Sequence, residues 1–236
     1  MDAAADIGFR QDNPDTGRLF VVATPIGNLG DITFRAIEVL QNVHIIAAED
    51  TRHTGVLAKR YNISTKRISF YDHNAKKRLP DLLNRMKTGQ DVALVSDAGT
   101  PGISDPGYIL IRNCIDNNIP VISIPGPTAL ITALVISGMP TERFVFEGFL
   151  PVKKGRKTRL ELLAEEPRTI VFYESPHRIN RTLGDLLQYF GDRDIAIIRE
   201  VTKLYEEVVR LRISEAVERF RQRKPKGEFV LVVRGK

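Results

Sequence analysis

Short apolar runs alternate with amphipathic segments along the first part of this chain, and this alternation constrains the fold more than any other feature. Strands that alternate with helices form a mostly parallel sheet covered by helices on both faces. The sequence therefore predicts an α/β fold, with Asp31 as the N-cap of the first helix. We expect strands at 19–23, 43–48, 67–71, 92–95 and 121–124, and helices at 33–41, 55–61, 80–87, 109–115 and 129–137.

The pattern changes after Thr141, where the strand-like runs become longer and indicate paired strands in a mixed sheet. We expect one helix to open at Ser175-Pro176 and end at Gly191, and a basic helix to be capped by Ser214. The expected strands lie at 144–149, 169–173, 195–199, 206–213 and 229–233. The predicted organisation is a disordered leader at 1–18, an N-terminal α/β domain at 19–138 with a mostly parallel sheet, and a C-terminal α/β domain at 141–236 with a mixed sheet.

Composition excludes several classes of protein. The chain has 42% hydrophobic residues, as globular proteins do, and no apolar run approaches the ~20 residues of a membrane span. Its first residues lack the apolar segment of a secretory signal. The single cysteine, Cys114, excludes an internal disulfide and suits a reducing compartment. We therefore expect a cytoplasmic location.

Positive charge gathers in three clusters. The net charge of +6 favours a polyanionic partner such as nucleic acid. Solvated lysines and arginines occur on any surface, but clustering favours contact with phosphates. The clusters lack the aromatic interleaving typical of single-strand binding, so readout of bases is not predicted. The clusters are Lys76-Lys77-Arg78; Lys153, Lys154, Arg156, Lys157 and Arg159; and Arg219, Arg221, Arg223, Lys224 and Lys226.

The segment from Val95 to Tyr108, VSDAGTPGISDPGY, follows one of the expected strands and contains three glycines. It matches neither G-x-G-x-x-G nor a P-loop, which ends in Gly-Lys-Ser/Thr. Asp-Pro-Gly and Thr-Pro-Gly also occur in ordinary turns, so a structural role is an alternative. The length of about a dozen residues exceeds that of most connections and favours a rigid loop that binds a ligand.

Three glycine- and proline-rich loops follow strands of the predicted parallel sheet, at 24–30, 96–107 and 125–128. The carboxyl ends of parallel strands meet at one edge, so we expect these loops to converge on one cleft. The helix after Pro127 presents free N–H groups there. A fourth such loop, 226–228, precedes the last strand, and Phe172-Tyr173-Glu174 in the second domain could close the cleft.

The sequence lacks the patterns typical of several other kinds of active site. The four histidines, His44, His53, His73 and His177, show no metal-ligand spacing, so no metal is expected. A G-x-S-x-G elbow is missing, and the glycine loop has no lysine for phosphoryl transfer.

Seven motifs in order along the chain closely resemble one family. They are ATPIGNLGDIT (23–33), AAEDTRHT (47–54), SDAGTPGISDPG (96–107), PGPTALITAL (125–134), EGFLP (147–151), FYESPHR (172–178) and KGEFVLVV (226–233). The family is the ribosomal small-subunit RNA methyltransferase I group, within the tetrapyrrole-methylase-like class of S-adenosylmethionine enzymes. The resemblance spans Leu19 to Val233.

The resemblance implies a two-domain homodimer with S-adenosylmethionine in a cleft between the domains. It also implies 2′-O-methylation of a cytidine ribose at the decoding centre of small-subunit (16S) ribosomal RNA, with this RNA or the 30S subunit as partner. The implied cofactor residues are Asp97, Ala98, Gly99, Thr100, Ile103, Pro127, Thr128, Ala129, Phe172, Tyr173, Gly227 and Glu228. The expected substrate-binding residues are Pro25, Asn28, Arg52, Lys153, Lys154 and Arg156.

Transfer to a ribose hydroxyl requires removal of its proton, and a general base typically contributes ~10²–10⁴-fold. The candidates for this role are Asp50, Glu49 and His53, which follow a predicted strand. Arg52 suits phosphate binding or stabilisation of substrate charge. A structural ion pair between Asp50 and Arg52 is an equally weighted alternative, and a lone loop histidine often serves only as a hydrogen-bonding group.

Two further functions stay open on sequence grounds. One is a methyltransferase of the same fold that acts on a tetrapyrrole or on a protein residue. The other is a non-catalytic RNA-binding factor in ribosome assembly that retains the pocket.

Overall fold

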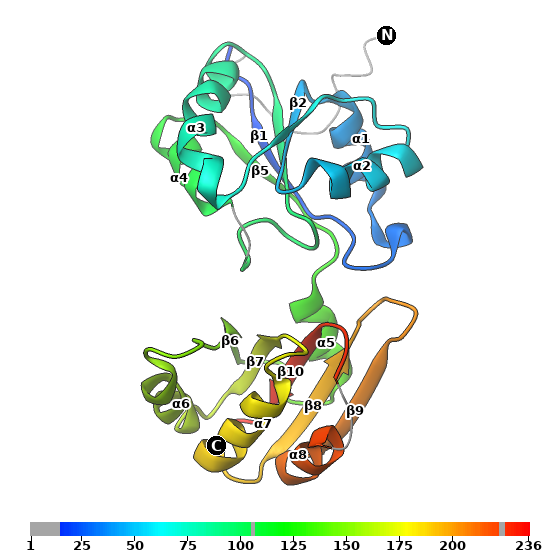
Figure 1. Cartoon of the computed structure of the whole chain (residues 1–236). Helices are drawn as coiled ribbons and strands as arrows, with labels where there is room; N and C mark the ends of the chain where they lie inside the picture. Colours follow the sequence, from blue (N-terminus) through cyan, green and yellow to red (C-terminus); the bar gives the residue numbers. More distant parts are fainter. Residues whose placement is uncertain (1–14, 105–106, 222–224) are drawn as a thin grey trace. The chain divides into compact units, whose positions relative to one another are not determined.

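The computed structural model describes residues 15–104, 107–221 and 225–236, and its two compact units are Met1–Thr128 and Ala129–Lys236 (Figure 1). The division falls before the expected boundary at 138–141. Helix α5 (Ala129–Ser137) belongs to the second unit because it packs against two of that unit's strands. None of the described helices combines the length and apolarity needed to span a membrane.

The first unit is built on a five-stranded sheet in the order β3-β2-β4-β1-β5, and all its strand pairs are parallel. Every residue of β1, β2 and β4 is buried, as expected for strands covered on both faces. The strands are β1 (Leu19–Val22), β2 (Ile45–Ala48), β3 (Arg67–Ser69), β4 (Val92–Val95) and β5 (Val121–Ile124).

Helices cover both faces of this sheet (Figure 1). Alternate residues of β1 enter different cores: Phe20 and Val22 pack with α1 and α2, whereas Leu19 and Val21 pack with α3 and α4. Cys114 lies in the second of these cores, and burial raises the pKa of its thiol to about 12. The helices are α1 (Phe34–Asn42), α2 (Thr51–Arg60), α3 (Asp72–Lys87) and α4 (Tyr108–Asp116).

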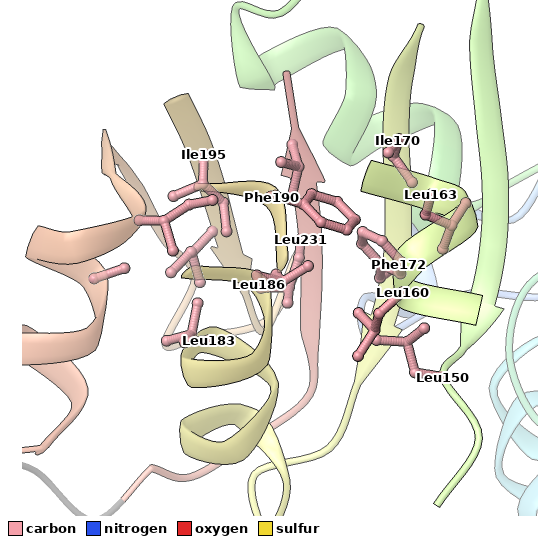
Figure 2. Close-up of a cluster of buried hydrophobic side chains, with 14 of the residues drawn as sticks. Leu150, Leu160, Leu163, Ile170, Phe172, Leu183, Leu186, Phe190, Ile195 and Leu231 are labelled. Carbon is pink, nitrogen blue, oxygen red and sulfur yellow. The ribbon is translucent and has the colours of Figure 1, made fainter. Parts of the chain in front are cut away.

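The second unit contains a mixed sheet in the order β6-β7-β10-β8-β9, in which only the β6–β7 pair is parallel among the described strands. Its main core includes Phe172, Phe190 and Leu231 (Figure 2). The strands are β6 (Phe144–Phe149), β7 (Thr169–Glu174), β8 (Asp194–Arg199), β9 (Glu207–Arg212) and β10 (Phe229–Val233). The helices of this core are α6 (Arg156–Ala164), α7 (Ile179–Phe190) and α8 (Ile213–Arg221).

Strand β10 shows how this sheet is covered. Phe229, Leu231 and Val233 face the core formed with α6, α7 and α8. The residues between them, Val230 and Val232, are also buried, and α5 packs against β10 and β8. Because successive side chains of a strand point to opposite faces, α5 covers the second face of the sheet. The predicted fold class is therefore confirmed: a parallel sheet in the first unit and a mixed sheet in the second.

Several predicted helix boundaries were wrong for identifiable reasons. Helix α1 is capped by Thr33, whose hydroxyl accepts a hydrogen bond from the Ala36 amide at 3.1 Å, and Asp31 lies in a preceding 3-10 turn, η1 (Leu29–Asp31). Helix α3 begins at Asp72 and contains Pro80 in its interior. The Ser175 carbonyl accepts from Arg178 and Ile179 in a turn before α7, and Ser214 lies inside α8.

Part of the leader predicted at 1–18 is packed in the structure. Residues 1–14 lie outside the described residues. Gly17, however, is buried and donates its amide to the Met86 carbonyl at 2.7 Å. Arg18 forms an ion pair with Asp91 at 2.6 Å, and both side chains are mostly buried. The packed part of the chain therefore begins before β1.

Substitution of Gly17 tests this packing. A Cβ atom at this position would lie 2.1 Å from the Gln90 carbonyl oxygen, so Gly17→Ala must displace backbone. We expect a loss of about 1–3 kcal/mol in the free energy of unfolding, measured by urea denaturation. Gly55→Ala is the matched control, because Gly55 lies in α2 with nothing within 4 Å of its Cβ position; it should gain about 0.5–1 kcal/mol. Equal stabilities of G17A and wild type would contradict the packing described.

Candidate functional site

The topology of the first unit creates a crevice at the carboxyl end of β4. Strands β1 and β4 are hydrogen-bonded neighbours, yet the helices that follow them, α1 and α4, cover opposite faces of the sheet. Helix α2, which follows β2 on the other side of β4, covers the same face as α1. In open α/β sheets, ligands bind where neighbouring connections diverge in this way.

A backbone bridge joins two of the loops at this crevice. The Thr24 amide donates to the Gly99 carbonyl and the Gly99 amide donates to the Thr24 carbonyl, each at 2.9 Å. The Thr24 hydroxyl also donates to the Ser96 carbonyl at 3.1 Å. Gly99 has φ of +78°, which a residue with a side chain adopts only at a cost. The loops after β1 and β4 are therefore held together by main-chain contacts.

The loop after β5 joins them. A Cβ atom at Gly126 would lie 3.0 Å from Ala23 Cβ, and one at Gly99 would lie 3.9 Å from the Pro127 carbonyl oxygen. The described parts of the loops at 24–30, 96–107 and 125–128 therefore lie side by side, as predicted, and a cleft shared by all three stays a prediction. The loop at 226–228 belongs to the second unit, and its participation stays a prediction.

Two carboxylates link the loop after β2 to the same place. Asp97 accepts a hydrogen bond from the Asp50 amide at 3.0 Å, and Glu49 accepts one from the Asp97 amide at 3.2 Å. This reciprocal pair fixes the ends of β2 and β4 relative to each other. Glu49 and Asp97 are both half-buried, so their negative charges are partly desolvated at the crevice.

A cavity of about 170 Å³ lies at this edge of the first unit. Two of its lining residues, His53 and Asp97, carry titratable side chains. The other lining residues are Thr24, Pro25, Gly27, Leu29, Thr54, Val56, Leu57 and Ser96. The sequence predicted Thr24 and Ser96 in loops that bind a ligand. For Val56 and Leu57 it predicted only the apolar face of a helix.

Asp50 is placed as a structural group. It is the N-cap of α2 and accepts from the Arg52 amide at 2.8 Å, so the EDTRH segment is the start of a helix rather than a loop. Its carboxylate also accepts two bonds from the Arg52 guanidinium, at 3.2 and 2.8 Å. The hydrogen bonds from Arg52 lower the pKa of Asp50 to about 2. A carboxylate this acidic is a poor proton acceptor, and the geometry favours the ion pair over the role of general base.

The other two candidates for the general base, Glu49 and His53, differ in position. The Glu49 carboxylate is engaged with the Asp97 amide and does not line the cavity. His53 is exposed on the first turn of α2 and does line it. Arg52, whose side chain is 90% exposed, keeps most of its guanidinium available to a phosphate despite the ion pair. His53 is therefore the base candidate that the geometry places at the cavity.

The expected substrate-binding residues separate into two groups. Pro25 lines the cavity, and exposed Asn28 accepts the Gly30 amide at 3.0 Å to cap the turn η1. Lys153 and Lys154 are exposed. Arg156 was assigned wrongly as a contact to RNA: it is 4% exposed and binds Asp185 at 2.7 Å inside the second unit.

The cofactor residues implied by the resemblance also differ in accessibility. Phe172 is fully buried in the core of the second unit, so its side chain cannot border a ligand (Figure 2). Glu228 is 81% exposed, and its carboxylate binds Lys203 at 2.8 Å. In the first unit Ala98 and Ile103 are exposed, whereas Gly99 is buried.

The crevice of the first unit suits a small cation with polar groups. Gly99 and Gly102, both with positive φ, let a ligand approach the main chain closely. The carboxylates of Asp97 and Glu49 complement a positive charge such as a sulfonium. Among the described residues, no group of three or more His, Cys, Asp or Glu side chains could hold a metal ion.

Comparison with known proteins agrees with this arrangement. The family model of tetrapyrrole (corrin/porphyrin) methylases matches residues 18–217. A cobalt precorrin-4 methyltransferase aligns with a TM-score of 0.70 at 16% identity, over 92% of this chain and 94% of that one. A uroporphyrin-III C-methyltransferase from Thermus thermophilus, solved with S-adenosylhomocysteine, aligns with a TM-score of 0.63 at 20% identity, over 92% and 97%. These two likenesses show the fold.

Two relatives share much more of the sequence, and both are named ribosomal RNA small subunit methyltransferase I. The protein from Synechocystis sp. is 54% identical over 93% of this chain and 79% of its own length. The protein from Thermotoga maritima is 50% identical over 93% of this chain and 99% of its own length. The chain belongs to the tetrapyrrole methylase family, in the group of the small-subunit ribosomal RNA methyltransferases I. It is an S-adenosylmethionine-dependent methyltransferase.

Titration of Asp50 distinguishes its two roles. Because Arg52 depresses the folded-state pKa, the ion pair stabilises the fold above the ordinary pKa near 3.8 and loses this contribution as pH falls toward about 2. Carbon-detected NMR of the side-chain carboxyl should give a pKa near 2 in wild type and a higher value in Arg52→Gln. A wild-type pKa above 4 would restore Asp50 as a candidate base.

Proposed function

We propose that this methyltransferase acts on ribosomal RNA of the small subunit and methylates the 2′-hydroxyl of a cytidine ribose at the decoding centre. The main support for an RNA substrate is the 54% identity, over 93% of the chain, to a protein named for that substrate. The net charge of +6 supports a polyanionic substrate. The ribose hydroxyl and the cytidine rest on the motif resemblance. A homodimer and a cytoplasmic location stay predictions.

The cavity at the end of β4 is proposed as the site of the acceptor ribose. Its volume of about 170 Å³ is below the ~300–1,000 Å³ of pockets that hold drug-sized ligands, so it suits one sugar rather than the whole cofactor. Its lining is mostly apolar, with His53 and Asp97 as the charged or titratable groups. A hydroxyl that enters it would meet His53 from α2 and Asp97 from the loop after β4.

Bound S-adenosylmethionine supplies a methyl group that its sulfonium already makes electrophilic. The chain must then orient the ribose hydroxyl and accept its proton. Orientation by a rigid site can lower the barrier by several kcal/mol. The Thr24–Gly99 bridge and the Asp97–Asp50 hydrogen bond supply that rigidity. His53 would accept the proton, and Asp97 with Glu49 would hold the cationic centre of the cofactor beside it.

Transfer of label tests the proposed substrate. Tritiated S-adenosylmethionine is incubated with the protein and with undermethylated small subunits, and separately with a tetrapyrrole. We expect label in the ribosomal RNA within an alkali-resistant dinucleotide, since a 2′-O-methyl group blocks alkaline cleavage. Label in a base would contradict methylation of the ribose. Label only in the tetrapyrrole would contradict RNA as the substrate. Binding of RNA and cofactor without transfer would favour an assembly factor.

Two substitutions in α2 test the proton acceptor. His53→Ala should lower kcat for RNA methylation by about 10²-fold, because a general base contributes at least that much. Asp50→Asn should leave kcat within a few-fold of wild type, because asparagine caps a helix as well as aspartate does. His73→Ala, at an exposed position of α3, controls for loss of a surface histidine. The assignment fails if D50N loses activity and H53A keeps it, with cofactor affinity equal by calorimetry.

A further inference from the structure

Three consecutive carbonyl groups in the segment between β6 and α6 are each bound by a different arginine. Arg178 donates to the Leu150 carbonyl, Arg156 donates to that of Pro151 at 3.1 Å, and Arg181 donates to that of Val152 at 3.0 Å. Arg178 directly precedes α7, and Arg181 lies in its first turn. Carbonyls of surface loops usually bind water. Here three guanidiniums fix the path of the main chain.

The arginines are themselves held by two acids, of which Glu174 is buried and Asp185 is partly buried. Arg156 binds Asp185 at 2.7 Å and the Thr182 hydroxyl at 2.9 Å, and it is 4% exposed. The Thr182 hydroxyl in turn donates to Glu174, which is 2% exposed and pairs with Arg178 at 3.5 Å. Burying such charges carries a desolvation cost even when they are paired. A loop that only connected a strand to a helix would not require this network.

The fixed segment presents two lysines to solvent. Lys153 and Lys154 follow Val152 directly and are exposed, and neither ammonium has a partner among the described residues. The other members of the same basic cluster are engaged: Lys157 pairs with Glu161, Arg159 with Glu147, and Arg156 is buried. The three arginines exceed the two acids, Glu174 and Asp185, by one charge, so the local field is positive before the lysines are added.

We infer that residues 150–155 form a preformed clamp for the RNA backbone, in which Lys153 and Lys154 contact phosphates and Arg156, Arg178 and Arg181 act as positioning residues. The inference rests on the proposed RNA substrate. Phosphate contacts set the register and orientation of a nucleic acid on a protein. Cations on a fixed main chain lose less conformational entropy on binding than cations on a mobile loop, so each contact is stronger.

The contact residues are tested by salt dependence. Affinity for undermethylated small subunits is measured by filter binding at several salt concentrations, with wild type, Lys153→Ala/Lys154→Ala, and the matched control Lys66→Ala/Lys87→Ala. The first variant should bind about tenfold more weakly and reduce the slope of log K against log salt by about 1.4, since each phosphate contact contributes about 0.7. The control removes the same charge from two exposed positions outside the three basic clusters and should change the slope by less than half as much.

The positioning residues are tested by Arg156→Lys and Pro151→Gly. Lysine keeps the charge beside Asp185 but cannot also reach Thr182 and the Pro151 carbonyl, and the buried site cannot touch RNA directly. Glycine at 151 loosens the segment and removes no charge. Both variants should bind RNA about three- to tenfold more weakly, with affinity for S-adenosylmethionine unchanged by calorimetry and with an unchanged midpoint of thermal unfolding for P151G. Lys153 and Lys154 remain present in both, so only their placement changes.

Two results would overturn the clamp and leave the proposed function intact. One is a wild-type salt slope in the Lys153→Ala/Lys154→Ala variant while RNA is still methylated. The other is wild-type RNA affinity in both R156K and P151G. By contrast, absence of RNA binding and methylation in the wild-type protein would overturn the proposed function itself.

Discussion

The two hydrogen bonds between Thr24 and Gly99 are the contact on which the candidate site depends. Strands β1 and β4 run side by side, but α1 and α4 leave them toward opposite faces of the sheet. Without a cross-link the two loops would diverge and leave an open crevice. The bridge requires positive φ at Gly99, which explains a glycine there on conformational grounds. It also places Asp97 where its carboxylate can accept the Asp50 amide.

Charged residues have two distinct uses in this protein. Three ion pairs hold main chain in place: Asp50 with Arg52, Asp185 with Arg156, and Glu174 with Arg178. Lys153, Lys154 and the outer part of Arg52 face solvent and are available to a ligand. Each solvent-facing cation lies within a few residues of an ion-paired group in the sequence. The ion pairs therefore fix the position of the cations that can bind a ligand. A count of basic residues does not separate the two uses.

The sequence was sufficient to predict the architecture because hydrophobic periodicity reports burial directly. All five strands of the first unit were expected, and so was the convergence of their loops. The boundary errors arose where two local signals compete: Asp31 and Thr33 can both cap a helix, and Pro80 is typical of a first turn but lies inside α3. Arg156 was misassigned because its partner, Asp185, is distant in sequence, so adjacency to Lys153 and Lys154 suggested a shared surface. For Val56 the sequence indicates only the apolar face of a helix, and nothing in it indicates a place in the cavity.

Cys114 shows how burial in a core between helices and a sheet limits the chemical reactivity of a thiol. It is the sole thiol of the chain, lies in the core formed by α3 and α4, and has a Met86 sulfur 4.0 Å away. With its pKa raised to about 12, almost none of it is thiolate at neutral pH, so both access and ionisation protect it. Any modification of this thiol must therefore pass through an opening of the first unit. The rate of that modification therefore measures how often the core between α3, α4 and the sheet opens.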